Sequence, residues 1–255
     1  MEIDAVKAYF ENEDIVEHYA EAAGGLGLWR SEEKIFTRLF KQEESLLELG
    51  AGAGRIANGL YELNYRNILA TDYSRAMVTR ARDLCKLLEY PIPFHVADVC
   101  QLKFEDAIFD GAIFGFNGLM QIPRAALRKQ ALSEIFRVLI PGAWFCFTTH
   151  DRDRSMHQEF WRAERARWAE GTQDRGLECF GDRAEPAKGA VHFMHVPTVA
   201  EMESLLSGVG FHVEASVMRS ELTEEPEEVT TFSDDCRFWV VQKPVELSSH
   251  PSAGT

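Results

Sequence analysis

The chain has 255 residues, 45% of them hydrophobic, and a formal net charge of -14 at neutral pH. A chain of this length can bury a substantial single core, which predicts one α/β domain with insertions. The acidic balance argues against a nucleic-acid partner, because long contacts with phosphate are usually made by a basic face. Composition leaves the oligomeric state, monomer or homodimer, open.

The five cysteines are widely scattered with no Cys-x-x-Cys pair, and the chain opens without a basic segment followed by an apolar run. No apolar run approaches the roughly 20 residues that span a bilayer. The sequence therefore predicts a reduced, cytoplasmic protein that does not insert into a membrane.

Residues 1–44 are expected to be helical and to precede the first strand. The stretch AVKAYFENEDIVEHYAEAA is expected to form one helix, the glycines of GGLG to break it, and SEEKIFTRLF to form another.

From Ser45 onward, short apolar runs alternate with segments of helical period, which is typical of a largely parallel sheet covered by helices. The expected strands are SLLELG (45–50), NILATD (67–72), IPFHVAD (92–98), FDGAIFGFN (109–117) and AWFCFTTH (143–150). Ser74 is the expected N-cap of the helix after the second strand. Pro141 and Gly142 are expected to stop the helix before the fifth.

Thr198 and Glu201 form a capping box for a helix that Gly210 should end. The runs FHVEASV and CRFWVVQKP then predict a closing pair of strands. The acidic stretch ELTEEPEE between them is expected to be a solvated turn.

Three glycines alternate directly after the first strand, at Gly50, Gly52 and Gly54. In open α/β sheets this turn is the usual ligand cradle, and glycine lets the ligand approach the backbone. A dinucleotide fingerprint would place its third glycine at position 55, where the chain has Arg55. Glu48 is expected to be buried and therefore to need a cation or a donor. The turn thus favours a ligand with an ammonium group over a pyrophosphate.

Two further acids follow the next strands. Asp72 lies 22 residues after Gly50, the spacing at which a carboxylate accepts from a ribose diol. Asp98 lies 26 residues further on and could accept from the exocyclic amine of an adenine. Each acid alone is more often a turn residue or a helix cap. Together with Glu48, they predict a ligand with an adenosine half.

The ordered motifs LELGAGAGRIA, ATDYS, HVADV, FDGAIFGFNGLMQIP and LIPGAWFCFTTHD resemble those of the class I S-adenosylmethionine-dependent methyltransferases, over roughly Ser45 to Asp151. The resemblance implies a Rossmann-like α/β fold: a seven-stranded, mostly parallel sheet with an antiparallel last strand and helices on both faces. The expected division is a helical lid (1–44), a methyltransferase domain (45–244) with an insertion (151–195) that departs from the strand–helix alternation, and a tail (245–255) whose small polar residues predict disorder.

The resemblance also implies S-adenosylmethionine as cofactor and assigns its contacts residue by residue. Asp72 would bind the ribose hydroxyls, Asp98 the adenine amine, and Glu48 the ammonium side of the glycine turn. The expected contacts within the domain are Glu48, Gly50, Ala51, Gly52, Arg55, Asp72, Tyr73, Ala97, Asp98, Val99, Phe116 and Asn117. From the lid, Tyr19, Trp29 and Arg30 would reach the methionine carboxylate or cover the sulfonium, unless the two aromatic residues only pack the lid on the sheet.

Methyl transfer from a sulfonium is an in-line displacement, so alignment and water exclusion are the main contributions of the protein. A general base is needed only if the acceptor arrives protonated. His150, at the end of the fifth strand, is the best-placed titratable residue, with Asp151 beside it. The alternative is that His150 only caps the strand end or contacts the insertion.

The insertion carries the residues expected to choose the acceptor. A pocket of His157, Phe160, Trp161, Arg165 and Trp168 could bind a carboxylate or phosphate on the substrate. The same stretch also reads as an amphipathic helix whose aromatic residues only pack against the sheet.

The sequence therefore predicts methyl transfer to O or N of a small-molecule acceptor. An Asn/Asp-Pro-Pro-aromatic loop, which accompanies base-amine methylation, is replaced by NGLM. No clear set of Asp and Asn ligands for magnesium is present, and no metal is expected. Two alternatives stay open: a nicotinamide-dependent oxidoreductase on a related sheet, against which Arg55 and Glu48 argue, and a non-catalytic S-adenosylmethionine-binding sensor or scaffold.

Overall fold

The computed structural model describes residues 3–187 and 189–245. Its centre is a seven-stranded sheet in the order β3-β2-β1-β4-β5-β9-β8. The strands are β1 (Leu46–Leu49), β2 (Ile68–Asp72), β3 (Phe94–Val96), β4 (Phe109–Phe114), β5 (Leu139–Thr149), β8 (His212–Met218) and β9 (Arg237–Gln242). Neighbours from β3 to β5 pair in parallel, whereas β9 runs antiparallel between β5 and β8. The predicted fold class and the antiparallel last strand are confirmed.

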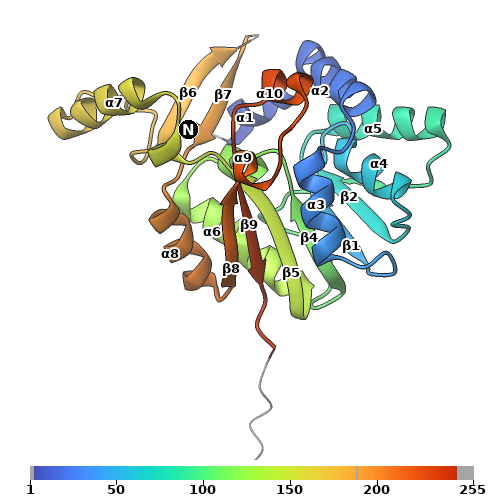
Figure 1. Ribbon diagram of the computed structural model, residues 1–255. Helices are drawn as coiled ribbons and strands as arrows, with labels where there is room; N and C mark the ends of the chain where they lie inside the picture. Colours follow the sequence, from blue (N-terminus) through green and yellow to red (C-terminus); the bar gives the residue numbers. More distant parts are fainter. Residues whose placement is uncertain (1–2, 188, 246–255) are drawn as a thin grey trace, which may run out of the picture.

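Helices cover both faces of the sheet (Figure 1). The helices of the described residues are α1 (Ile3–Phe10), α2 (Glu13–Gly25), α3 (Arg30–Leu39), α4 (Arg55–Glu62), α5 (Arg75–Leu88), α6 (Ala125–Val138), α7 (Gln158–Glu170), α8 (Val199–Val209), α9 (Arg219–Leu222) and α10 (Glu227–Phe232), with 3₁₀ turns at η1 (Gly118–Gln121) and η2 (Arg152–Arg154). The predicted caps are present. Ser74 Oγ accepts from the Met77 N–H at 3.1 Å, Thr198 and Glu201 form the capping box, and Gly210 ends α8 in the left-handed conformation.

The sheet is packed on both sides, which explains its near-continuous apolar strands. One core lies between the sheet and α3, α4 and α5, and the other between the sheet and α6 and α8. All four residues of β1 are buried. A strand in this position has no solvent-facing side, so Glu48 is carried into the interior.

The predicted long N-terminal helix is wrong, because the chain turns between α1 and α2. Asn12 Oδ1 accepts from the backbone N–H groups of Asp14 and Ile15, at 3.0 and 3.4 Å. An Asn side chain that satisfies the free N–H groups of a new helix favours a start at that point. The break lets α1 lie against β7 (Ala190–His195).

The predicted helix stop at Pro141 and Gly142 is also wrong. Helix α6 ends at Val138, and Pro141 with Gly142 lies inside β5 rather than stopping the helix. The register between β4 and β5 shifts here, because Phe109 pairs with Leu139 but Gly111 already pairs with Trp144. Gly142, with φ 87°, lies in this irregular segment of β5.

The acidic stretch after β8 is not a solvated turn, because it forms α9 and α10 with a short link between them. In that link, the Glu225 carboxylate accepts from the backbone N–H groups of Arg30 and Ser31, at 3.1 and 2.9 Å. A carboxylate is stabilised there by the unpaired N–H groups and by the dipole at the start of α3. The loop is thereby fixed over the N-terminal helices.

The insertion holds a structure that the sequence did not predict. Besides α7, which projects from the body (Figure 1), it forms an antiparallel hairpin of β6 (Asp182–Ala187) and β7. The predicted disordered tail falls almost wholly on 246–255, outside the described residues. Within the described part of the chain, none of the helices has the length and apolar character needed to cross a membrane.

Candidate active site

A cavity of about 180 Å³ opens where β1, β2 and β4 end, under the N-terminal helices. This is the edge at which open α/β sheets bind their ligands. Most of the residues predicted to contact the cofactor line it: Tyr19, Glu48, Gly50, Ala51, Gly52, Arg55, Asp72, Tyr73, Ala97, Asp98, Val99 and Phe116. Trp29, Arg30 and Asn117 do not line it.

The glycine turn needs glycine for two different reasons. Gly50 and Gly52 have φ angles of 60° and 55°, a region that other residues rarely adopt. At Gly50 a Cβ would also lie 2.6 Å from Cε2 of Phe114, whereas at Gly52 nothing lies within 4 Å. The backbone at Gly52 therefore faces open space into which a ligand can approach.

Asp72, the last residue of β2, holds this turn in place. Its Oδ2 accepts from the Gly52 N–H and its Oδ1 from the Ser74 N–H, both at 2.8 Å. Burial raises the pKa of Asp72 to about 6 despite these bonds, which favour the ionised form. Each carboxylate oxygen can accept a further hydrogen bond, so two hydroxyl donors can still be received. Asp98 Oδ1 accepts from the Cys100 N–H at 2.8 Å.

Glu48 is 3% exposed and lines the same cavity. Its Oε2 has no hydrogen-bond partner among residues 3–187 and 189–245. Burial raises the pKa of Glu48 to about 8, and the positive charge of Arg55 only partly opposes this effect. A buried carboxyl with a free oxygen is costly by itself, so the site fits a ligand that brings a donor or a positive charge.

Arg55 lies in the cavity wall, but its guanidinium is engaged elsewhere. Nη1 and Nη2 each donate to the Glu32 carboxylate at 2.6 Å, and both side chains are buried. Nη1 also donates to Gly27 O at 2.9 Å. This pair ties the start of α4 to α3, so Arg55 has a scaffolding contact, while its predicted contact with the cofactor stays a prediction.

Trp29 and Arg30 do not reach the cavity as predicted. Trp29 is 2% exposed and its ring lies between the guanidinium groups of Arg55 and Arg219, 4.3 and 5.1 Å from them. Arg30 is exposed and its Nη1 donates to Glu224 O at 3.3 Å. Arg30 therefore bonds to Glu224 and Glu225 of the acidic loop and not to a ligand in the cavity. The sequence around Arg30 does not reveal these distant partners.

An aromatic cluster closes the cavity from above. The Phe116 ring stands edge-on to Tyr19 and to Trp29, both at 5.7 Å, and lies 5.4 Å from Phe232 of α10. Burial raises the pKa of Tyr19, which keeps its hydroxyl protonated. Sequence reasoning missed Phe232 and the α1 residues that also line the cavity, because neither stands in a motif. The unpredicted α1 lining residues are Ile3, Val6, Lys7 and Phe10.

A second, larger cavity of about 930 Å³ lies beside the first and is bounded by His150, the hairpin β6–β7 and the acidic loop. His150 Nδ1 lies 3.0 Å from Asp235 O. Since a carbonyl only accepts, Nδ1 carries the proton and Nε2 is left as an acceptor. Burial lowers the pKa of His150, so the ring is neutral at pH 7.

Asn117 lies between the two cavities. It follows Phe116 of the first cavity, and its Nδ2 is 3.3 Å from Nε2 of His150 in the second. Its backbone has φ 60°, and its N–H donates to Thr148 Oγ1 at 2.8 Å. Asn117 was predicted to contact the cofactor. In the structure its neighbour Phe116 lines the first cavity, and the Asn117 side chain contacts His150.

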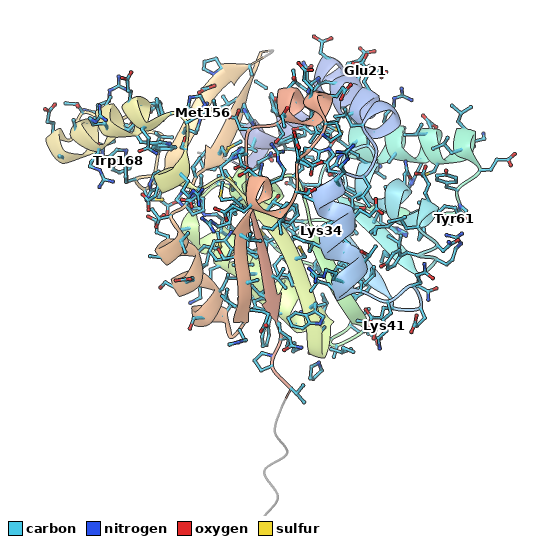
Figure 2. The ribbon with its side chains drawn as sticks, viewed as in Figure 1. Glu21, Lys34, Lys41, Tyr61, Met156 and Trp168 are labelled. Carbon is cyan, nitrogen blue, oxygen red and sulfur yellow. The ribbon has the colours of Figure 1, made fainter. Side chains whose placement is uncertain are left out.

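Only some of the residues predicted to bind the acceptor line the second cavity. His157 and Trp161 line the second cavity, whereas Phe160, Arg165 and Trp168 do not. Trp168 lies on the projecting α7, away from the sheet (Figure 2). Met156, which the sequence did not single out, lines the second cavity.

Asp151 does not act with His150. Its Oδ2 pairs with Nη2 of Arg237 at 2.8 Å, and both side chains are buried. The pair bridges the end of β5 and the start of β9, a structural position.

A sheet of this order, with a glycine turn after β1 and acids within β1, at the end of β2 and shortly after β3, is the arrangement of the class I S-adenosylmethionine-dependent methyltransferases. A family model described as a methyltransferase domain matches residues 47–147. This match and the relatives described next support a class I S-adenosylmethionine-dependent methyltransferase domain in this part of the chain, and the cofactor of that family is S-adenosylmethionine.

Individual relatives agree with that assignment. Methyltransferase phqN of Penicillium fellutanum is 29% identical over 141 residues, 52% of this chain and 42% of that protein. The ubiquinone/menaquinone biosynthesis C-methyltransferase UbiE of Brucella anthropi is 36% identical over 103 residues, 39% of this chain and 38% of that protein. The chain thus spans less than half the length of these curated relatives. A solved SAM-dependent methyltransferase from Methanosarcina mazei shares the fold at a TM-score of 0.64 and 20% identity, covering 83% of this chain and 98% of that one.

Proposed function

We propose that the protein transfers a methyl group from S-adenosylmethionine to an oxygen or nitrogen of a small-molecule acceptor. The observation that carries the proposal is Glu48, a buried carboxyl with one unpartnered oxygen, beside the open backbone of Gly52 and the hydrogen-bonded Asp72. This set complements a ligand with an ammonium group and a ribose diol. A pyrophosphate would meet the buried carboxyl of Glu48 and the partly buried carboxyl of Asp72, while the guanidinium of Arg55 is paired with Glu32, which counts against the nicotinamide alternative.

The residues that would hold the cofactor follow from their places in the cavity. Asp72 would receive the ribose hydroxyls, Asp98 the adenine amine, and Glu48 the ammonium group. Tyr19, Phe116 and Phe232, the members of the aromatic cluster that line the cavity, would cover the sulfonium together with α1. Exclusion of water there would suit a reaction in which charge disappears from sulfur.

The bound cofactor supplies an electrophilic methyl group; the protein supplies alignment and a base. In the proposed reaction the acceptor enters the second cavity, and its O–H or N–H lies against Nε2 of His150. In doing so, the acceptor displaces the Asn117 side chain, whose Nδ2 otherwise lies 3.3 Å from that nitrogen. Asp235 O keeps the proton on Nδ1, so Nε2 can take the acceptor proton as the methyl group is transferred.

Thermal melting separates this proposal from its rivals. S-adenosylhomocysteine at 100 times its dissociation constant should add about 2.7 kcal/mol to the free energy of unfolding, whereas NAD at the same concentration should add none. The proposal fails if NAD raises the midpoint and S-adenosylhomocysteine does not. Stabilisation without methyl transfer to any member of a panel of small hydroxyl and amine acceptors would instead favour a sensor or scaffold.

Cofactor binding is expected to release a proton through Glu48. With a pKa of about 8, roughly nine-tenths of the free protein holds this carboxyl protonated at pH 7. An ammonium group beside it favours the ionised form, so the affinity should rise as the pH is raised from 6 to 8. Calorimetry of S-adenosylhomocysteine binding in two buffers of different ionisation enthalpy measures the release.

Glu48→Gln should abolish the buffer dependence and weaken binding, because the amide can neither ionise nor balance the ammonium charge. The matched change Glu203→Gln, at an exposed position of α8, should leave both unchanged. Identical binding enthalpies in the two buffers with the wild-type protein would mean that Glu48 does not meet the ammonium group.

A further inference from the structure

The open end of the β6–β7 hairpin gathers three side chains that can bind a metal ion. Cys179 comes shortly before β6, Asp182 begins β6, and His195 ends β7 directly opposite Asp182. Their ligating atoms all lie within 4.8 Å of one another. Asp182 and His195 are buried, and Cys179 is partly so. The sequence did not draw these residues together, because the hairpin that pairs them was not predicted.

The separations of the three atoms are close to those of a tetrahedral zinc site. Zinc-to-sulfur bonds of about 2.3 Å and zinc-to-nitrogen or oxygen bonds of about 2.0 Å place sulfur about 3.5 Å from the other ligands, and nitrogen about 3.3 Å from oxygen. Cys179 Sγ lies 3.5 Å from Asp182 Oδ1 and 3.7 Å from His195 Nδ1. The Nδ1 to Oδ1 distance is 2.7 Å, so that pair would have to open by about 0.6 Å.

Backbone hydrogen bonds fix the orientation of the Asp182 carboxylate. Asp182 Oδ2 accepts from the backbone N–H groups of Glu178 and Cys179, at 3.0 and 3.1 Å. These bonds leave Oδ1 directed toward the thiol and the imidazole. Hydrogen bonds that orient a ligand in this way typically accompany metal sites.

Arg128 is a cation that lies beside the cluster. Its Nη2 lies 3.6 Å from Cys179 Sγ and 3.9 Å from Asp182 Oδ1, whereas its Nη1 donates to Ile122 O at 3.0 Å. Without a metal, the guanidinium balances the charge of Asp182. With a thiolate in the cluster, the bond to Ile122 keeps Nη2 in place as an N–H donor to the sulfur, outside the ligand shell.

We propose that Cys179, Asp182 and His195 bind a zinc ion, with the fourth position open to water. On binding, the Cys179 S–H bond breaks, its proton goes to solvent, and a zinc–sulfur bond forms. His195 changes tautomer, so its ring proton leaves Nδ1 and Nε2 is protonated instead. The hydrogen bond from Nδ1–H to Asp182 is lost, and the Nδ1 lone pair that is exposed binds the ion.

The ion would clamp the base of the hairpin. Arg183 of β6 and both His192 and Met194 of β7 reach from this hairpin into the second cavity. A clamp that ties β6 to β7 therefore fixes one wall of that cavity. The metal site stands on its own residues and does not depend on the proposed methyl transfer.

Cobalt(II) titration of the metal-free full-length protein tests the site. A thiolate-to-cobalt charge-transfer band and the visible bands of a tetrahedral ion are expected at one equivalent, and zinc should displace them. Cys179→Ser should remove the charge-transfer band. Cys85→Ser, at a buried thiol bonded to Asn58 Oδ1, should keep it.

Zinc alone provides the second measurement. One equivalent should raise the melting temperature of the wild-type protein, magnesium should not, and His195→Gln should lose the zinc effect. A wild-type protein without the charge-transfer band and without a zinc-dependent melting shift would show that the cluster is a buried ion pair with Arg128 and not a metal site. A band that persists in Cys179→Ser would also overturn the proposal.

Discussion

The Asp72→Ala variant is expected to lose the stabilisation that S-adenosylhomocysteine gives to the wild-type protein. A hydrogen bond to a charged group contributes about 1.5 to 3 kcal/mol, and Asp72 would receive two from the ribose. Losing both should weaken binding by a factor of about 100 or more. The variant also frees the N–H groups of Gly52 and Ser74, which loosens the turn around the ligand.

The free Asp72→Ala protein is expected to stay folded. Burial raises the pKa of Asp72 to about 6, above the 3.8 of an exposed carboxyl. A raised pKa means that ionisation is less favourable in the folded state, so the stability contribution of this group falls as the pH rises from about 4 through 6. At neutral pH, removal of the charge therefore offsets part of what the lost hydrogen bonds cost.

Calorimetry and melting curves with S-adenosylhomocysteine measure the effect of this substitution. Asp83→Ala is the matched control, since it makes the same change at an exposed position of α5. A variant that binds as tightly as the wild-type protein would make Asp72 a turn residue and place the ribose elsewhere.

The parts of the site that the sequence predicted are local. Gly50 and Gly52 follow a buried apolar run, and Asp72 ends the next one, so strand pattern and position alone bring these residues to the same sheet edge. The capping signals at Ser74 and Thr198 are also complete within four residues. Such features depend on short-range sterics and hydrogen bonding, which a single sequence displays.

The parts that the sequence missed depend on contacts between distant segments. Arg30 was expected at the cofactor, but its partners come from the acidic loop near residue 225, which became part of the scaffold by capping α3. Arg55 was assigned to the cofactor as part of the glycine-turn motif, yet the buried carboxylate of Glu32, from a distant helix, pairs with its guanidinium. Phe232 closes the cavity only because that same loop folds back over it.

Replacing His150 by glutamine is expected to lower kcat about 100-fold or more, the usual contribution of a general base, with whichever hydroxyl or amine acceptor is turned over. Glutamine keeps a polar side chain of similar reach, but neither of its polar atoms takes a proton near neutral pH. Cofactor binding should not change, because His150 lines the second cavity and not the first. His212→Gln, at an exposed position of β8, is the matched control and should retain full activity.

The pH profile distinguishes a base from a packing residue. Burial lowers the pKa of His150 from 6.5, whereas the neighbouring Asp235 carbonyl and the charge of Asp234 oppose the effect only in part. The neutral, proton-accepting form therefore predominates at pH 7, and wild-type kcat should be level there and fall only when the pH drops below 6.5. In His150→Gln, the fall of kcat at low pH should be absent, and kcat itself should be low at every pH. A reduced rate that still falls at low pH would assign the proton transfer to another group, and an unchanged rate would make His150 the cap of β5, held between Asp235 and Asn117.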